Sequence, residues 1–182
     1  MNKASRLEKG SCSEKRLLNI AIGAAFFLLI LDQLTKLLVE CKMIRGESIE
    51  IIKGFFSLTY VTNKGAAWGM FHGYGMVLFA VGVLVTITAI VFLRKLCDGY
   101  PERYLAVLTV LSGVLGNSID RLFRGEVVDF LDFYIKNRHW PAFNVADCAI
   151  CAGIFVYTLS VMIRPENKTA NSNSPADTGN VA

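Results

Sequence analysis

The sequence predicts an all-α polytopic membrane protein with four transmembrane helices and a small β-sheet outside the bilayer. Of its 182 residues, 53% are hydrophobic and only 19% are charged, against roughly 45–50% and about 25% in ordinary soluble domains. The apolar residues lie in blocks of about 20, the length that a helix needs to cross a membrane. A stretch with alternating apolar positions, residues 48–63, predicts short strands, which belong outside the bilayer because open strand edges cannot face lipid.

The first spanning helix is expected at about residues 17–39, after a basic segment at residues 1–16. A basic stretch before an apolar run is also typical of a cleaved signal peptide. However, residues 32–40, DQLTKLLVE, offer no small-x-small cleavage site. Asp32 and Lys36 lie four residues apart on one helix face, where their charges can neutralise each other out of water. A snorkelling pair that only anchors the helix is the alternative.

An insertion outside the bilayer is expected at about residues 40–74, and it holds the predicted strands. After them comes VTNKGAAWGMFHGYG, residues 61–75. Its glycines, Gly65 among them, and its alanines permit tight turns and close backbone approach, and Asn63 can both donate and accept hydrogen bonds. A simple turn before a helix has a similar composition, so this motif alone assigns no function.

Three more apolar runs follow: one at Met76–Leu93 without acid or base, one that begins at Tyr104, and one from about Ala142 to Ile163. The polar tail at residues 165–182 has no periodicity and is predicted to be disordered. Four spans place both termini on one side of the membrane. Ten lysines and arginines fall on that side and nine on the other; the first group is the denser along the chain, which places the termini in the cytoplasm.

Four aspartates, Asp120, Asp129, Asp132 and Asp147, lie between residues 116 and 147, at the edges of two predicted spans. Carboxylates at the edge of hydrocarbon are costly and usually functional. The predicted topology brings polar residues from four parts of the chain to the same outer level. These are Asp32, Lys36, Asn63, Asn117, Asp120, Arg121, Asp129, Asn144 and Asp147. Their convergence predicts one site on the outer side.

Two aspartates that share one proton can hydrolyse a peptide bond, because one carboxylate activates water while the other, protonated, polarises the carbonyl oxygen. No serine, cysteine or lysine nucleophile is then required. The histidines, His72 and His139, form no recognisable triad, and no zinc motif such as H-E-x-x-H occurs. The predicted chemistry therefore uses no metal and no organic cofactor.

Spacing alone leaves the identity of the pair open. Asp120 lies next to Arg121 and near Asn117, so we expect it to be held charged by a salt bridge in a structural role. Asp132 is interpreted as a solvated residue at the membrane interface. Asp129 and Asp147 remain, the latter with Asn144 one helical turn earlier to orient it.

The cysteines give no disulfide framework, since five is an odd number and their spacing is irregular. Cys148 and Cys151 form a C-x-x-C within an apolar run. We interpret them as two small residues packed on one helix face, rather than as a redox or metal site. No basic patch interleaved with aromatics is present, so nucleic acid is not expected as a partner.

Four motifs in order, DQLTK (32–36), VTNKGAAWG (61–69), GNSIDRLFRGEVVDFLDFY (116–134) and FNVADCAIC (143–151), resemble those of the lipoprotein signal peptidases, or signal peptidase II family. The similarity covers residues 17–164. It implies an aspartic endopeptidase of the bacterial inner membrane with an extracytoplasmic sheet cradle, and we expect the protein to be a monomer. Such an enzyme cuts lipid-modified prolipoproteins before the diacylglyceryl-cysteine.

The resemblance also assigns roles to residues. It implies that Asp129 and Asp147 are catalytic. It implies that the other motif residues support and line the site: Asp32, Lys36, Asn63, Gly65, Asn117, Asp120, Arg121 and Asn144.

Two other classes of protein remain as alternatives. A transporter or proton pathway also uses intramembrane acids and lysines, but it predicts polar residues at several depths. Met76–Leu93 has no charged residue, and the acids gather at one face. A membrane assembly factor without chemistry is the second alternative. Cleavage of a lipopeptide distinguishes both from a peptidase.

Overall fold

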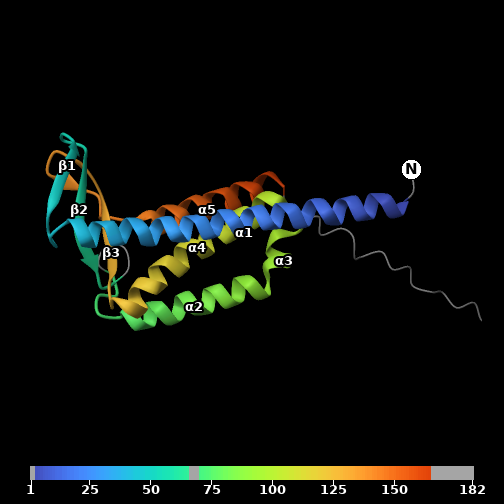
Figure 1. The fold of residues 1–182 in the computed structure, drawn as a ribbon, viewed down its shortest axis with the longest axis horizontal. Coiled ribbons are helices and arrows are strands. Elements are labelled where there is room, and N and C mark those ends of the chain that lie inside the picture. Colours follow the sequence, from blue (N-terminus) through green and yellow to red (C-terminus); the bar gives the residue numbers. More distant parts are fainter. Residues whose placement is uncertain (1–2, 66–69, 165–182) are drawn as a thin grey trace, which may run out of the picture.

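In the computed structural model, which describes residues 3–65 and 70–164, four long helices form a bundle, and a small antiparallel sheet lies across one end of it (Figure 1). The long helices are α1 (Lys3–Lys42), α2 (Gly75–Val91), α4 (Pro101–Phe123) and α5 (Val145–Ile163). The short helix α3 (Leu93–Cys97) connects α2 to α4 at the end away from the sheet.

Several of these helices can cross a membrane. Within the described residues, three meet the requirements of length and composition: α1 from Lys15 to Lys42, α4 and α5. Helix α2 is equally apolar but has 17 residues, and no residue of α2 is buried in the protein. One face of α2 packs on α4, and its other apolar side chains are exposed. An apolar helix with so many exposed side chains needs an apolar solvent, so the prediction of a polytopic membrane protein is confirmed.

Helix α1 is longer than the sequence predicted. It begins at Lys3 rather than near residue 17 and continues without a break to Lys42. Lysine, arginine, glutamate and leucine in this segment are good helix formers, and the helix continues through Gly10 and the serines that follow it. The predicted disorder of residues 165–182 falls outside the described part of the chain.

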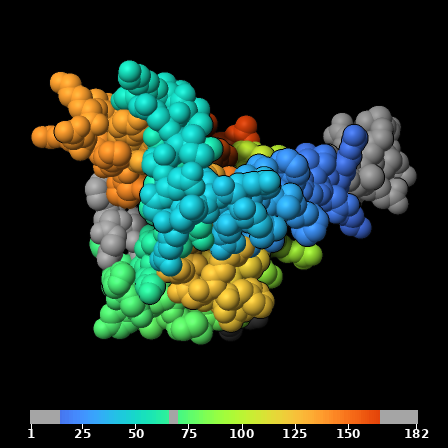
Figure 2. Space-filling view, turned by 60° about the vertical axis from the view of Figure 1, so that its left-hand side comes forward, coloured from blue at the N-terminus to red at the C-terminus, as the bar shows by residue number. Residues whose placement is uncertain are grey.

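The sheet has the order β1-β2-β3-β4 with antiparallel neighbours. Strands β1 (Ser48–Ile52) and β2 (Phe56–Asn63) lie where the alternating pattern predicted strands. Strands β3 (Val127–Ile135) and β4 (Arg138–His139) come from the aspartate-rich stretch, so the all-α label describes only the bundle. The strands β1 and β2, in teal, and the β3–β4 hairpin, in orange, stand together at this end of the molecule (Figure 2).

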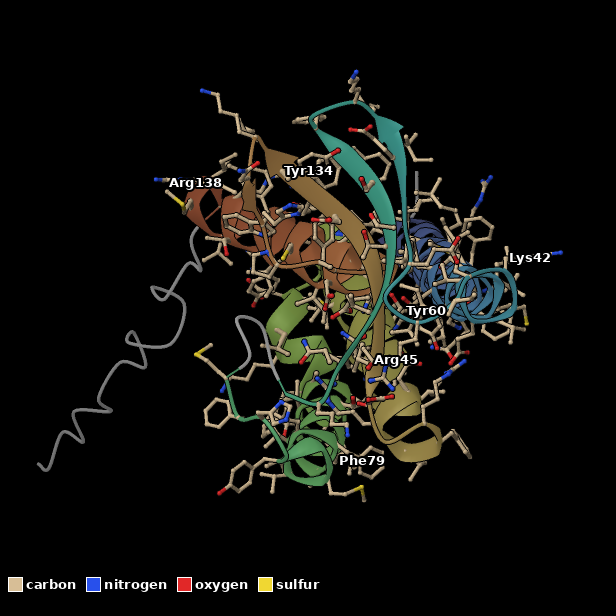
Figure 3. All side chains as sticks on the ribbon, turned by 90° about the vertical axis from the view of Figure 1, so that its left-hand side faces the viewer. Lys42, Arg45, Tyr60, Phe79, Tyr134 and Arg138 are labelled. Atoms are coloured by element: carbon tan, nitrogen blue, oxygen red, sulfur yellow. The ribbon has the colours of Figure 1, made fainter. Side chains whose placement is uncertain are left out.

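Helix α4 is the centre of the bundle, since it contacts α1, α2, α3 and α5. Glycines allow α5 to approach it closely: a Cβ on Gly153 would lie 2.7 Å from the carbonyl oxygen of Ala106, and one on Gly113 would overlap the carbonyl oxygen of Ala146. Seen from the sheet end, the sheet crosses in front of the helix ends, with Tyr134 on the sheet and Arg138 at its outer margin (Figure 3). Polar residues on the last turns of α4 therefore lie within reach of α1, α5 and β3.

Candidate active site

All the residues that the sequence singled out lie at the sheet end of the bundle. Asp32 and Lys36 are on α1, Asn63 ends β2, Asn117, Asp120 and Arg121 are on α4, Asp129 is on β3, Asn144 and Asp147 open α5, and Gly65 follows β2. Hydrogen bonds and ion pairs connect them into one cluster. The antiparallel pairing of β2 with β3 places Asp129 opposite Val61, near the start of the segment that carries Asn63 and Gly65.

The start of helix α5 fixes the position of Asp147. Asn144 is the N-cap residue, and its side-chain oxygen accepts a hydrogen bond from the backbone N–H of Asp147 at 3.0 Å. In return, Asp147 Oδ2 accepts one from the backbone N–H of Asn144 at 3.2 Å. This reciprocal capping box holds the carboxylate at the N-terminus of the helix, where negative charge is favoured, and Asn144 orients Asp147 as expected.

Two side-chain amides connect the aspartates. Asn144 Nδ2 donates to Asp129 Oδ1 at 2.7 Å, and Asn117 Nδ2 donates to Asp147 Oδ1 at 2.8 Å. The side-chain carbonyl oxygen of Asn117 accepts from Lys36 Nζ at 3.0 Å. Because the ammonium group can only donate, it turns the amide N–H₂ of Asn117 toward Asp147. Each aspartate is thus held by a donor whose own orientation is fixed.

Asp129 is an acid with a strongly raised pKa. Its side chain is only 4% exposed, and burial is the main reason that the pKa of Asp129 rises from 3.8 to about 7; the nearby Asp147 carboxylate raises it further. Hydrogen bonds from Asn144 and Asn63 oppose the rise. With this pKa, Asp129 can both hold a proton beside the Asp147 carboxylate and release it near neutral pH, which is the division of labour that general acid–base hydrolysis needs.

A buried ion network lies on the helix side of the aspartate pair. Lys36 Nζ is 2.9 Å from Asp32 Oδ2 and 2.8 Å from Asp120 Oδ2, and all three side chains are at most 1% exposed. Arg124 adds a contact of 2.7 Å to Asp120. Asp32 also accepts from the backbone N–H of Ala146 at 2.8 Å, which joins α1 to the first turn of α5. The predicted pairing of Asp32 with Lys36 is confirmed.

The salt bridge expected for Asp120 is present, but Arg121 is not its partner. Consecutive helix residues point in different directions, so Lys36 and Arg124 bind Asp120 instead. The guanidinium of Arg121 donates to the backbone carbonyl oxygens of Gly65 at 3.1 Å and Asn117 at 3.2 Å. Asn63 accepts from the backbone N–H of Gly65 at 2.9 Å. Arg121 therefore ties the segment after β2 to α4.

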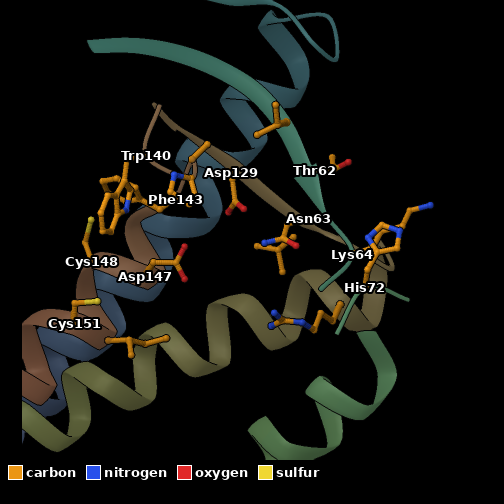
Figure 4. A pocket seen from close by; sticks show the side chains of 16 residues that line it. Thr62, Asn63, Lys64, His72, Asp129, Trp140, Phe143, Asp147, Cys148 and Cys151 are labelled. Atoms are coloured by element: carbon orange, nitrogen blue, oxygen red, sulfur yellow. The ribbon is translucent and has the colours of Figure 1, made fainter. Parts of the chain in front are cut away.

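A cavity of about 860 Å³ opens beside the two aspartates. Asp129 and Asp147 line its middle, with Asn63, Lys64 and His72 toward one end and Trp140, Phe143, Cys148 and Cys151 toward the other (Figure 4). Arg121 lines it too, whereas the Asp32, Lys36 and Asp120 network does not. One end of the cavity is apolar and the other is polar, and the two carboxyl groups lie between them.

Asp132 is not the solvated residue that the sequence suggested. It is 7% exposed, and both of its carboxylate oxygens lie 3.0 Å from Nδ1 of His139. The ring of His139 also stacks on Tyr134 at a centroid distance of 4.8 Å. This contact holds β4 against β3, directly before the Trp140–Phe143 loop that forms one cavity wall.

Several residues of the site were not predicted from the sequence. Gln33 donates to Asp120 at 3.1 Å, and Arg124 bonds both Asp120 and Glu40. Arg124 follows Asp120 by four residues on a helix, which is the spacing of an ion pair and could have revealed it. The cavity wall of Trp140 and Phe143 carries no such local signal. Among the described residues, no group of three or more histidines, cysteines and acids could hold a metal ion.

Comparisons with known proteins agree on one family. A family profile described as signal peptidase (SPase) II matches residues 24–163. Lipoprotein signal peptidases of Geobacter metallireducens and Geobacter sulfurreducens are 43% and 45% identical, over 80% and 78% of this chain and 91% and 90% of theirs. A solved structure described as a bacterial membrane enzyme superposes with a TM-score of 0.76 at 32% identity, over 85% of this chain and 94% of that one.

Proposed function

The chain belongs to the signal peptidase II family, and we propose that it is an aspartic endopeptidase that removes signal peptides from lipid-modified prolipoproteins. The family resemblance of the four sequence motifs is thereby confirmed, and membership makes the protein a membrane peptidase. The observation that carries the aspartic assignment is the pair itself. Asp129 and Asp147 line one cavity, each bonded to an amide, and burial and mutual repulsion keep a proton on Asp129.

In the proposed reaction, Asp147 removes a proton from a water molecule while the oxygen of that water attacks the scissile carbonyl carbon. Asp129 donates its proton to the carbonyl oxygen, which gives a neutral tetrahedral diol. The diol collapses when Asp147 passes its proton to the leaving amine and Asp129 takes one back from a hydroxyl group. The C–N bond breaks, a carboxyl and an amine are released, and the pair returns to its starting state.

The cavity suggests how the substrate lies. Its apolar end, with Trp140, Phe143 and Ile150, suits the lipid-modified side of the cleavage site, and its polar end suits the peptide backbone. The cut then falls immediately before the diacylglyceryl-cysteine.

Large apolar side chains are exposed on the helices, Phe155 and Ile154 of α5 among them, and they favour lateral entry of the substrate from the lipid. Arg121, Asn63 and Gly65 position the segment that borders the polar end.

We further propose a topology of four spans, with α2 as the fourth, in a bacterial inner membrane. Both termini lie in the cytoplasm and the site at the periplasmic face. The peptidase unit is residues 17–164, between the basic segment 1–16 and the tail 165–182, with the insertion at about 40–74. The unit acts as a monomer on prolipoprotein within membrane lipid.

Cleavage of a diacylated prolipoprotein peptide by the purified full chain in lipid or detergent tests the proposal. A peptide of the same sequence with an unmodified cysteine is the control. We expect the lipidated peptide to be cut before its modified cysteine and the control to be left intact. Equal cleavage of both peptides would contradict the lipid requirement, and cleavage of neither would contradict the peptidase.

A further inference from the structure

Two thiols lie on the wall of the active-site cavity. Cys148 and Cys151 are both free and exposed, and both line the cavity on the same side as Trp140 (Figure 4). The sequence interpretation of two small residues packed on a helix face is therefore wrong, because both residues are exposed at the cavity rather than buried against a neighbouring element. No step of the proposed hydrolysis uses them.

The spacing of these thiols suits one ligand bound by both. Residues three apart on an α-helix lie on one face, with Cβ atoms roughly 5–6 Å apart. Thiolates are soft ligands and select soft partners. Cys41 and Cys97 do not share this setting, since Cys41 is an exposed residue of α1 and Cys97 is buried in α3.

We propose that Cys148 and Cys151 form a dithiol site for monosubstituted trivalent arsenicals, and that a ligand bound there closes the cavity to substrate. The first part rests on the position of the thiols alone. The second part rests on the proposed function, because it requires that peptide binds in this cavity. Cys148 and Cys151 line the same cavity as Asp147, so a ligand on the two sulfurs occupies space in the cavity that holds the catalytic carboxylate.

The reaction at the site is a substitution without oxidation or reduction. An arsenical of the form R–As=O reacts with two thiols: both S–H protons go to the oxygen, two As–S bonds form, and one water molecule leaves. Arsenic stays trivalent throughout. Ring closure explains the selectivity, because the second As–S bond forms within the molecule at a high effective concentration. A single thiol forms only one such bond and exchanges readily with added thiols.

Intact-mass measurement of the full chain, after treatment with phenylarsine oxide, tests the site without reference to activity. Wild type, Cys148→Ser, Cys151→Ser and the matched control Cys41→Ser are treated and then washed with excess 2-mercaptoethanol. We expect wild type and Cys41→Ser to retain one phenylarsenic group and both cavity variants to retain none. Dimercaptopropanol, itself a dithiol, should remove the group from wild type. An adduct that survives the monothiol wash in Cys148→Ser or Cys151→Ser, or its absence from wild type, would overturn the dithiol site.

Cleavage of the lipidated peptide tests closure of the cavity, with each protein compared with its own untreated rate. Treatment followed by the monothiol wash should reduce the wild-type rate at least tenfold, and dimercaptopropanol should restore it. Cys151→Ser should keep most of its own rate after the same treatment. Full activity of wild type that carries the adduct would overturn closure. If untreated wild type cuts no peptide, the proposed function fails, and the mass measurement still decides whether the site exists.

Discussion

The buried ion network and the aspartate pair are two groups of carboxylates side by side, and they differ in how their charges are satisfied. In the network, Lys36 lies within 3.0 Å of Asp32, Asp120 and the Asn117 amide oxygen, and Arg124 also binds Asp120. In the pair, Asp129 receives amide hydrogen bonds and, within the described part of the chain, forms no ion pair; its neighbour at the cavity is the Asp147 carboxylate.

This difference distinguishes carboxylates that stabilise the fold from carboxyl groups that can exchange a proton with substrate. A buried carboxylate with close cations has its charge compensated, so it can hold helices together. A buried carboxyl beside another carboxylate cannot ionise freely, so it retains a proton that it can give away. We infer that Asp129 and Asp147 share that proton, whereas Asp32 and Asp120 take no part in the reaction.

The largest expected effect comes from removing either member of the pair. Asp129→Asn and Asp147→Asn should each lower the rate of lipopeptide cleavage by roughly 100- to 10,000-fold, because each removes a group that moves a proton. Both variants should remain folded and inserted in the membrane. Single-turnover cleavage measures the effect, and a variant with the wild-type rate would show that its aspartate is not catalytic.

Breaking the network should affect folding instead. Lys36→Met leaves Asp32 and Asp120 buried without their shared cation, which should lower the free energy of unfolding by about 3–5 kcal/mol. Lys42→Met is a matched control, since Lys42 is an exposed residue at the end of the same helix. Unfolding of both variants in detergent measures the difference. Equal stability of Lys36→Met and Lys42→Met would remove the distinction between the two groups of carboxylates.

The stability of Asp129→Asn relative to wild type should depend on pH. Below pH about 4 the carboxyl is protonated in the folded and the unfolded chain, so it costs nothing. Between about 4 and 7 the unfolded chain releases the proton and the folded chain keeps it, because the pKa of Asp129 is raised from 3.8 to about 7. Wild type therefore loses stability as the pH rises through this window.

The amide of the Asp129→Asn variant has no proton to lose, so the advantage of the variant should grow from near zero at pH 4 to at most about 4 kcal/mol at pH 8. Unfolding curves at several pH values measure it. An advantage that stays constant from pH 4 to 8 would mean that Asp129 ionises normally in the folded protein.

The smallest expected effect concerns the cavity wall. Asp132→Asn weakens the contact with His139, which is itself 54% exposed, so the loss should be about 1 kcal/mol. Because this contact holds the strand before the Trp140–Phe143 loop, we expect KM for the lipopeptide to rise roughly fivefold with kcat unchanged. Steady-state kinetics measure both constants, and a loss confined to kcat would instead place Asp132 in the reaction.

Local patterns predicted the parts of the fold and the site that depend on neighbours in sequence. The pairing of Asp32 with Lys36 and the cap that Asn144 provides for Asp147 join residues four and three apart, and the helices follow from their apolar runs. Strands β1 and β2 follow from alternation. Strand β3 was not predicted, although VVDFLDFYI has the β-branched and aromatic composition of a strand. Its aspartates were interpreted as residues at the edge of a membrane span instead.

Long-range contacts could not be predicted from local patterns. Lys36 reaches Asn117 across 81 residues, and Gln33 reaches Asp120 across 87. Nothing near Asp120 indicates that Lys36, rather than the adjacent Arg121, is its partner. Asp132 was interpreted as solvated because the sequence does not show that His139 folds back over it.

The pH dependence of single-turnover cleavage by wild type tests the shared proton most directly. We expect the rate to fall as the pH rises through about 7, where Asp129 loses its proton, and to fall again in acid, where no carboxylate remains to act as the base. A rate that keeps rising from pH 7 to 9 would rule out the shared proton, because it would require a base other than these two aspartates.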